Sequence, residues 1–166
     1  ELLTFDLSGA GTELVDRTFV GHCEAYDIAD FYSGAINARA QLMTRGDDVF
    51  MVCPRTPAGT AELIRLDVTT DGAAIAMKAQ LPSRVYSDAV LHGDTVVLTS
   101  FDNNRYESTV HVCAAKGGGV LHTTVLEGRA NAVLANDAGV FVVDGDFGLW
   151  SYDADLELHH AAPLSL

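Results

Sequence analysis

Four short runs of strand-forming residues recur in the same order three times along this chain. The repeated units span residues 40–81, 87–127 and 130–164, and residues 1–21 repeat the second half of such a unit. A glycine in the first turn of each unit marks the period, because Gly46, Gly93 and Gly139 lie 47 and 46 residues apart. A unit of this length cannot bury its apolar faces alone, so neighbouring units must stack on one another.

The pattern inside each unit predicts antiparallel strands joined by tight turns. The second run of each unit is continuously apolar, at residues 49–53, 96–99 and 140–143, as expected for a strand covered on both faces. Polar turns rich in Gly, Asn and Asp separate the runs. We therefore expect an all-β fold of four-stranded antiparallel sheets in one domain, and a two-layer β-sandwich is the alternative. Residues 22–39 form an insertion between units, in which we expect a short helix that stops near Gly34.

The last unit carries a recognisable motif. Residues 144–153 read Asp-Gly-Asp-Phe-Gly-Leu-Trp-Ser-Tyr-Asp, which resembles the turn and third strand of a quinoprotein-type propeller blade. The repeated units resemble quinoprotein-like or WD40-like blades. The resemblance implies a radial β-propeller, a superfamily that contains scaffolds, lyases and quinone-dependent dehydrogenases. The docking motif that ends such blades is absent, because residues 154–157 read Ala-Asp-Leu-Glu, so no quinone or other cofactor is expected.

About three and a half blades are present, fewer than the roughly four to eight of a closed propeller. We therefore expect further blades from the same chain or from another one.

Charge and hydropathy exclude several classes of partner. The net charge of −13 repels the phosphates of nucleic acids and anionic membrane surfaces. The apolar runs reach about five residues, whereas a transmembrane helix needs roughly 20. We expect a soluble protein that binds neither nucleic acid nor membrane.

The three cysteines bear on the cellular compartment. Cys53 and Cys113 lie inside apolar strand patterns, where a free thiol behaves as a small hydrophobic residue. Free buried thiols favour a reducing compartment, so the sequence predicts a cytoplasmic or other intracellular location. We expect no metal site, because the pairs His111–Cys113 and His22–Cys23 lack the further ligands that zinc requires.

Candidate binding residues gather in the loops that share one rim of a propeller. These are the loops between second and third strands and the connections between units. Arginine and tyrosine are the residue types enriched at interface hot spots, and clustered arginines on an acidic chain suggest an acidic peptide as partner. The predicted binding residues are Arg55, Arg84, Tyr86, Arg105, Tyr106 and Arg129.

Three functions remain open from the sequence. The first is a protein-interaction or scaffolding surface without catalysis, which we favour. The second is a lyase or hydrolase that acts on a polar or sugar substrate through rim carboxylates such as Asp88, Asp102 and Asp144. The third is a structural segment that another chain completes. Enzyme motifs such as a Gly-x-Ser-x-Gly elbow are absent, and Arg45-Gly46-Asp47 reads as a strand-connecting turn.

Overall fold

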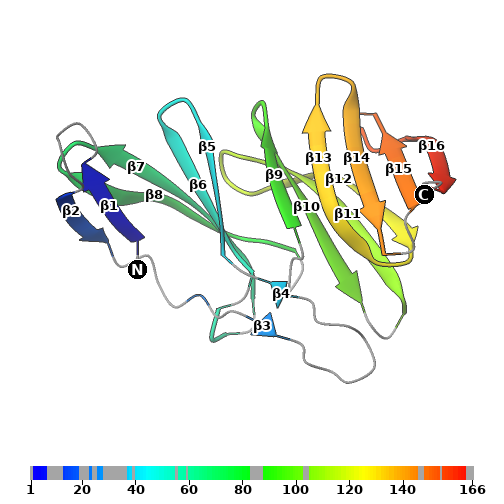
Figure 1. The fold of residues 1–166 in the computed structure, drawn as a ribbon, viewed down its shortest axis with the longest axis horizontal. Coiled ribbons are helices and arrows are strands. Elements are labelled where there is room, and N and C mark those ends of the chain that lie inside the picture. The colour runs from blue at the N-terminus through cyan, green and yellow to red at the C-terminus, as the bar shows by residue number, and fades with distance from the viewer. Residues whose placement is uncertain are drawn as a thin grey trace.

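The fold consists of separate antiparallel sheets arranged side by side (Figure 1). This computed structural model describes residues 2–6, 13–18, 23, 26–27, 37–38, 40–54, 56–58, 60–82, 88–102, 105–145, 148–153 and 155–163. In these segments the regular structure is entirely β, without a helix. The sheets follow one another along the chain, and within each full sheet every strand pairs with its sequence neighbour.

Three of the sheets have four strands. The first full sheet contains β5 (Gln41–Arg45), β6 (Asp48–Cys53), β7 (Glu62–Thr69) and β8 (Gly72–Gln80). The second full sheet contains β9 (Asp88–His92), β10 (Thr95–Asp102), β11 (Glu107–Ala114) and β12 (Val120–Glu127). The third full sheet contains β13 (Ala130–Asn136), β14 (Gly139–Asp144), β15 (Gly148–Tyr152) and β16 (Leu158–Pro163).

Two smaller sheets complete the described structure. The half-sheet pairs β1 (Leu2–Asp6) with β2 (Glu13–Thr18), and it lies next to β8. In the insertion, β3 (Tyr26–Asp27) pairs with β4 (Asn37–Ala38). These four insertion residues are strand, not helix. The rest of the predicted helix lies outside the described residues.

Apolar faces of adjacent sheets form the core. Phe50 and Leu63 of the first full sheet share one cluster with Leu98 of the second, and all three are fully buried. Val97 and Val110 of the second full sheet share another cluster with Val142 of the third. The four-stranded repeat is therefore confirmed. The sandwich alternative is wrong, because the strands form a row of stacked sheets and not two layers.

The hairpin turns follow the local sequence. Gly46 and Gly93 have φ angles of +57° and +54°, in the left-handed region that glycine enters without steric cost. The Arg45-Gly46-Asp47 tripeptide is thus a turn between β5 and β6, as predicted. In each full sheet the turn after the first strand lies at the same end, opposite the end that carries β3 and β4 (Figure 1).

A disulfide joins Cys23 of the insertion to Cys53 at the end of β6, with the two Cα atoms 5.5 Å apart. The prediction that Cys53 is a free thiol is therefore wrong. Cys53 is only 1% exposed, so its apolar surroundings are those the sequence indicated. A buried cysteine can pack as a small apolar residue and be oxidised as well, and the strand pattern alone does not distinguish the two states.

Candidate functional site

At one end of the sheets, two described turns between second and third strands lie next to the connection between the second and third full sheets. The backbone N–H of Gly128, which follows β12, donates to the carbonyl of Tyr106 in the β10–β11 turn at 3.0 Å. The N–H of Gly145, which follows β14, donates to the carbonyl of Arg129 at 2.6 Å. Turns between second and third strands therefore contact the connection between the second and third full sheets.

A buried serine stabilises this meeting point. The Ser108 hydroxyl donates to the carbonyl of Gly128 at 2.9 Å and accepts from the N–H of Ala130 at 2.7 Å. Ser108 is fully buried, and these two bonds give its hydroxyl both a donor and an acceptor role. The connection between the two sheets is thus fixed on either side of Arg129.

Tyr106 is the most distinctive of the predicted binding residues. Its φ angle of +55° lies in the left-handed region, which is uncommon for residues other than glycine, asparagine and aspartate. The residue is 54% exposed, and its ring makes a T-shaped contact with the ring of Phe101, with 5.7 Å between ring centroids. The hydrogen bond from Gly128 and the contact with Phe101 hold an exposed aromatic ring at this position.

Arg105, which precedes Tyr106, and Arg129, which follows Gly128 in the sheet connection, lie in different environments. The Arg105 side chain is 75% exposed, and its Nε lies 3.9 Å from Asp102 Oδ2. An ion pair at this distance and exposure contributes little, so Arg105 remains accessible to a partner. Arg129 is half-buried. The other three predicted binding residues, Arg55, Arg84 and Tyr86, lie outside the described residues.

Asp88 contacts the first strands of all three full sheets. Its Oδ1 accepts from Gln41 Nε2 of β5 at 3.1 Å and from the N–H of Ala89 at 3.0 Å. Its Oδ2 accepts from the N–H of Val133 in β13 at 2.8 Å. Both carboxylate oxygens are therefore engaged by the protein, and this side chain connects sheets.

Asp144 has an equally structural set of contacts. It is buried, its Oδ1 accepts from the N–H of Gly148 at 2.6 Å, and its Oδ2 accepts from Trp150 Nε1 at 2.7 Å. The carboxylate thus ties the β14–β15 turn to the side chain of the following strand. Among the three carboxylates named for the alternative enzyme hypothesis, Asp88 and Asp144 serve the fold, and Asp102 alone is on an exposed part of the rim.

His111 and Cys113 are part of the core, as their strand pattern suggested. His111 is 6% exposed, and its Nδ1 shares a hydrogen bond of 2.9 Å with Thr123 Oγ1. Burial lowers the pKa of His111 and raises the pKa of the fully buried Cys113 to about 11. In the described part of the chain, no three His, Cys, Asp or Glu side chains converge in a way that could hold a metal ion.

Two features of functional interest were not predicted. One is the Cys23–Cys53 disulfide. The other is Arg45, whose guanidinium reaches the turn of the next sheet and pairs with Asp94 Oδ1 at 2.7 Å. The repeat offers one sequence signal for Arg45. Arg45 immediately precedes Gly46 in the first turn of its unit, and His92 occupies the equivalent position immediately before Gly93.

Comparisons with known proteins bear on the fold. Neither a protein-family model nor a curated protein sequence matches the chain. Among solved structures, BamB from Moraxella catarrhalis superposes with a TM-score of 0.53 at 14% identity, over 76% of this chain and 35% of that one. A europium-containing methanol dehydrogenase superposes with a TM-score of 0.49 at 15% identity, over 75% of this chain and 26% of that one.

This chain therefore spans about a third of BamB and a quarter of the dehydrogenase. No helix in the described segments has the length and apolar character needed to cross a membrane. The row of four-stranded antiparallel sheets and the likeness to BamB lead to the same conclusion. The chain has the fold of consecutive β-propeller blades, and its described segments form three four-stranded blades and one two-stranded partial blade.

Proposed function

We propose that this chain is a segment of a larger β-propeller that binds another protein through its rim and catalyses no reaction. The observation that carries the proposal is Tyr106, an exposed aromatic ring held on a left-handed backbone between fixed neighbours. Unusual backbone conformations persist where the surrounding structure enforces them, and they cluster at functional sites. Tyrosine offers a large rigid contact area together with one polar group, which suits a protein interface.

Arg105, which precedes Tyr106 in the β10–β11 turn, supports a partner with acidic character. Arg105 is exposed, and its nearest described acid, Asp102, forms only a distant pair with it. A carboxylate from a partner can form a bidentate pair with a guanidinium, which is both stronger and more specific than the present contact. We infer that the rim binds an acidic protein segment.

The alternative of a lyase or hydrolase has less support. Acid–base catalysis requires carboxyl groups that can reach the proton they transfer. Asp88 and Asp144 each accept hydrogen bonds on both oxygens from groups that hold the sheets and turns together. Of the three carboxylates named for that reaction, two are thus committed to the fold, and a pair that could share acid and base roles is not assembled from them.

Site-specific photo-crosslinking tests the rim. With p-benzoylphenylalanine in place of Tyr106 in the full-length protein, we expect a discrete protein adduct in cells. The Arg105→Glu change in the same chain should reduce the adduct, whereas Lys116→Glu, the same charge change on the exposed β11–β12 turn, should not. The same probe at Leu121, which is 52% exposed on β12, supplies the positional control. Equal yields at positions 106 and 121 would contradict the proposal.

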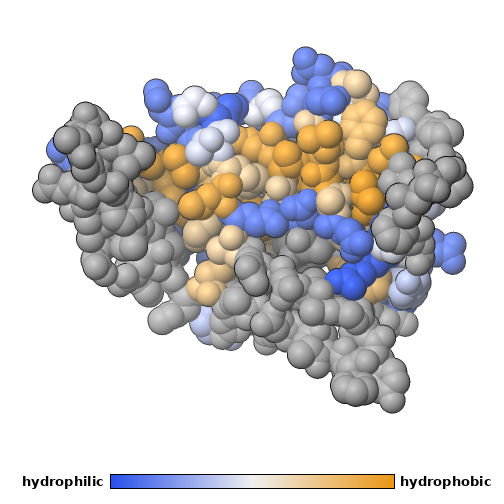
Figure 2. Space-filling model, in the orientation of Figure 1, coloured by the Kyte–Doolittle hydropathy of each residue, from blue (hydrophilic) through white to orange (hydrophobic). Residues whose placement is uncertain are grey.

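We also propose that further sheets cover both ends of the row. Leu134 of β13 is 57% exposed, although the equivalent Met43 and Val90 pack against the sheet that follows their own. Leu42 of β5 is 57% exposed on the opposite side of the row, although the equivalent Ala89 and Val133 pack against the preceding sheet. Figure 2 shows apolar side chains in a band across the viewed face, over the first strands of the sheets. Further sheets, from the same chain or from another one, would cover the exposed apolar side chains of Leu134 and Leu42 at the two ends of the row.

The cellular compartment remains a prediction, and the disulfide bears on it. Disulfides persist in oxidising environments and are rare in the cytosol, where thiols are kept reduced. The Cys23–Cys53 bond therefore supports an oxidising compartment over the intracellular location expected from the sequence. We propose that the chain folds in such a compartment, with Cys113 retained as a buried free thiol.

A further inference from the structure

A cleft of about 400 Å³ separates the β9–β10 turn of the second full sheet from the β13–β14 turn of the third. It lies at the end of the sheets opposite to the rim. Val97, Val112 and Val140 form its apolar part. Asp94 lines it from the second full sheet and Asp137 from the third, and both are exposed, with 83% and 105% relative accessibility of their side chains. Its volume is within the range of pockets that hold small ligands or single side chains.

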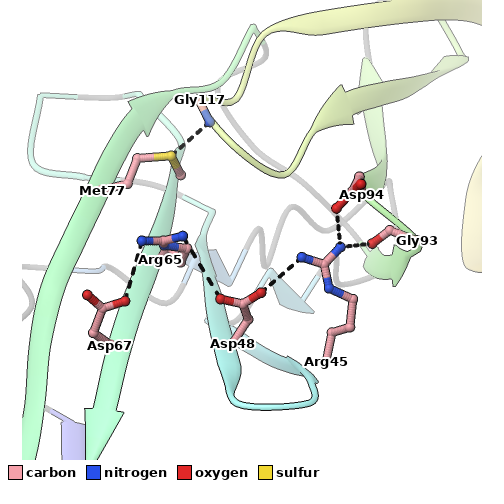
Figure 3. Close-up of polar contacts among 8 residues, drawn as sticks. All are labelled: Arg45, Asp48, Arg65, Asp67, Met77, Gly93, Asp94 and Gly117. Atoms are coloured by element: carbon pink, nitrogen blue, oxygen red, sulfur yellow. Dashed lines mark hydrogen bonds and ion pairs between the residues drawn. The ribbon is translucent and has the colours of Figure 1, made fainter.

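The equivalent gap between the first and second full sheets shows which chemistry fits there. Arg45, the last residue of β5, extends across that gap to the β9–β10 turn (Figure 3). Its Nη1 donates to the carbonyl of Gly93 and to Asp94 Oδ1, and its Nη2 donates to Asp48 Oδ2 at 2.9 Å. Asp48 also faces Arg65, with 3.9 Å between the nearest charged atoms. A guanidinium on an extended apolar stem thus joins one turn to the next.

The repeat places a shorter side chain at the same position beside the cleft. His92 ends β9 as Arg45 ends β5, since each pairs across its hairpin with the first residue of the following strand. His92 Nε2 lies 3.6 Å from Asp137 Oδ1, which is beyond hydrogen-bond distance. The imidazole therefore does not replace the guanidinium, and the Asp137 carboxylate is left without a close cationic partner among the described residues.

We propose that this cleft binds the arginine side chain of a partner polypeptide. The guanidinium would be received by the carboxylate of Asp137 and by the Oδ2 atom of Asp94, whose Oδ1 already accepts from Arg45, and the valines would cover its methylene stem. Charge-assisted hydrogen bonds from arginine to carboxylate are the strong class of such contacts, and a planar guanidinium can serve acceptors on both sides. The net charge of −13 adds a long-range attraction for cationic segments. This site is independent of the rim, so either proposal can fail without the other.

Peptide titration followed by NMR tests the assignment. The probe is the capped tripeptide Gly-Arg-Gly, and the same peptide with citrulline is an uncharged control of nearly the same shape. We expect saturable amide shifts confined to the β9–β10 and β13–β14 turns with the arginine peptide only. A lysine peptide with the same shifts and affinity would show that the cleft selects positive charge alone, which would overturn the assignment to arginine.

Two variants make the test specific. His92→Arg should supply a guanidinium from within, as Arg45 does in the preceding gap, and should abolish the titration. Asp137→Asn should weaken binding by roughly tenfold or more, the effect of losing one charged hydrogen-bond acceptor. Asp71→Asn makes the same charge change in the β7–β8 turn and should leave the affinity unchanged. The amide spectrum of each variant reports whether it is folded. Saturation of His92→Arg at the affinity of the original chain would overturn the proposal.

Discussion

The Asp144 carboxylate is a single group on which a turn and a strand both depend. It is buried, and it accepts from the N–H of Gly148 and from the indole of Trp150. Replacing Asp144 with Ala leaves both donors without this acceptor, so we expect a loss of about 2–4 kcal/mol in the free energy of unfolding. Urea denaturation, monitored by the fluorescence of Trp150, measures this loss. Trp150 is the single tryptophan of the chain and one of the two hydrogen-bond donors to Asp144.

A double-mutant cycle separates the indole bond from the turn. Trp150→Phe removes one donor, keeps an aromatic ring and should cost less than Asp144→Ala. If Asp144 and Trp150 interact directly, the loss in the double variant should be smaller than the sum of the two single losses. Strict additivity would show that the carboxylate acts through Gly148 alone. This cycle needs an independent probe of unfolding, such as circular dichroism, because Trp150→Phe removes the fluorophore.

His111 should make the stability of the protein depend on pH. Burial lowers its pKa, so the folded chain takes up a proton less readily than the unfolded chain. Its contribution is therefore complete above the ordinary histidine pKa of roughly 6.5 and is lost as the pH falls from there through the folded-state pKa. We expect His111→Gln to have a flatter stability profile than the original chain between about pH 7.5 and 5, as measured by urea midpoints. Parallel profiles would mean that His111 contributes nothing to the pH dependence.

The strands of the repeated units could be predicted because the signal for each of them is local, whereas β3 and β4 of the insertion were expected as helix. Val96, Val97 and Leu98 form an apolar run in sequence, and in β10 their exposed fractions are 0–1%. The connections could not be predicted in the same way. Cys53 pairs with a cysteine 30 residues away, and Arg45 contacts Asp94 49 residues away. Such contacts depend on how sheets are placed next to one another, which strand periodicity does not encode.

The candidate rim also combines features that the sequence predicted with features that it could not predict. The repeat predicts that the turns between second and third strands meet the connections between sheets. The hydrogen bonds donated by Gly128 and Gly145 show this meeting in the described part of the chain. The left-handed backbone of Tyr106 could not be expected, because nothing in its residue type favours a positive φ. The structural roles of Asp88 and Asp144 were also hidden, since a carboxylate on a loop looks the same in sequence whether it serves catalysis or folding.

The disulfide should stabilise the connection between the insertion and the first full sheet. A cross-link that closes a loop of 30 residues restricts the unfolded chain, and its loss typically costs about 2–4 kcal/mol. We expect the Cys23→Ser and Cys53→Ser variants to melt at a lower temperature than the original chain, and reductant to lower the melting temperature of the original chain alone. Peptide mass mapping without reduction should recover the Cys23–Cys53 pair from protein isolated from its own cells. Free thiols at both positions would contradict the pair and the oxidising compartment together.

The outer face of the third full sheet has the residue pattern of an interface between sheets. Each internal interface buries the apolar third residue of the second strand, as Phe50 of β6 and Val97 of β10 show with exposed fractions of 0% and 1%. Phe141 holds the same position in the third full sheet and is only half-buried, next to the exposed Leu134. This face therefore carries the apolar residues of an interface between sheets, although it is exposed to solvent.

The Leu134→Ser substitution tests whether a further sheet covers this face, because its cost in the free energy of unfolding differs between a covered and an exposed face. In the 166-residue chain, Leu134 is largely exposed, so the substitution should change the free energy of unfolding little and should reduce self-association, as measured by analytical ultracentrifugation. In a protein where a further sheet covers the face, the same substitution removes a buried side chain and introduces a hydroxyl there, so it should cost about 2–4 kcal/mol. Thr124→Ser on β12, a half-buried position in an outer strand, controls for the handling of both proteins. A small effect in both contexts would show that no sheet packs on Leu134, and the face would then have to be explained as a permanent outer surface.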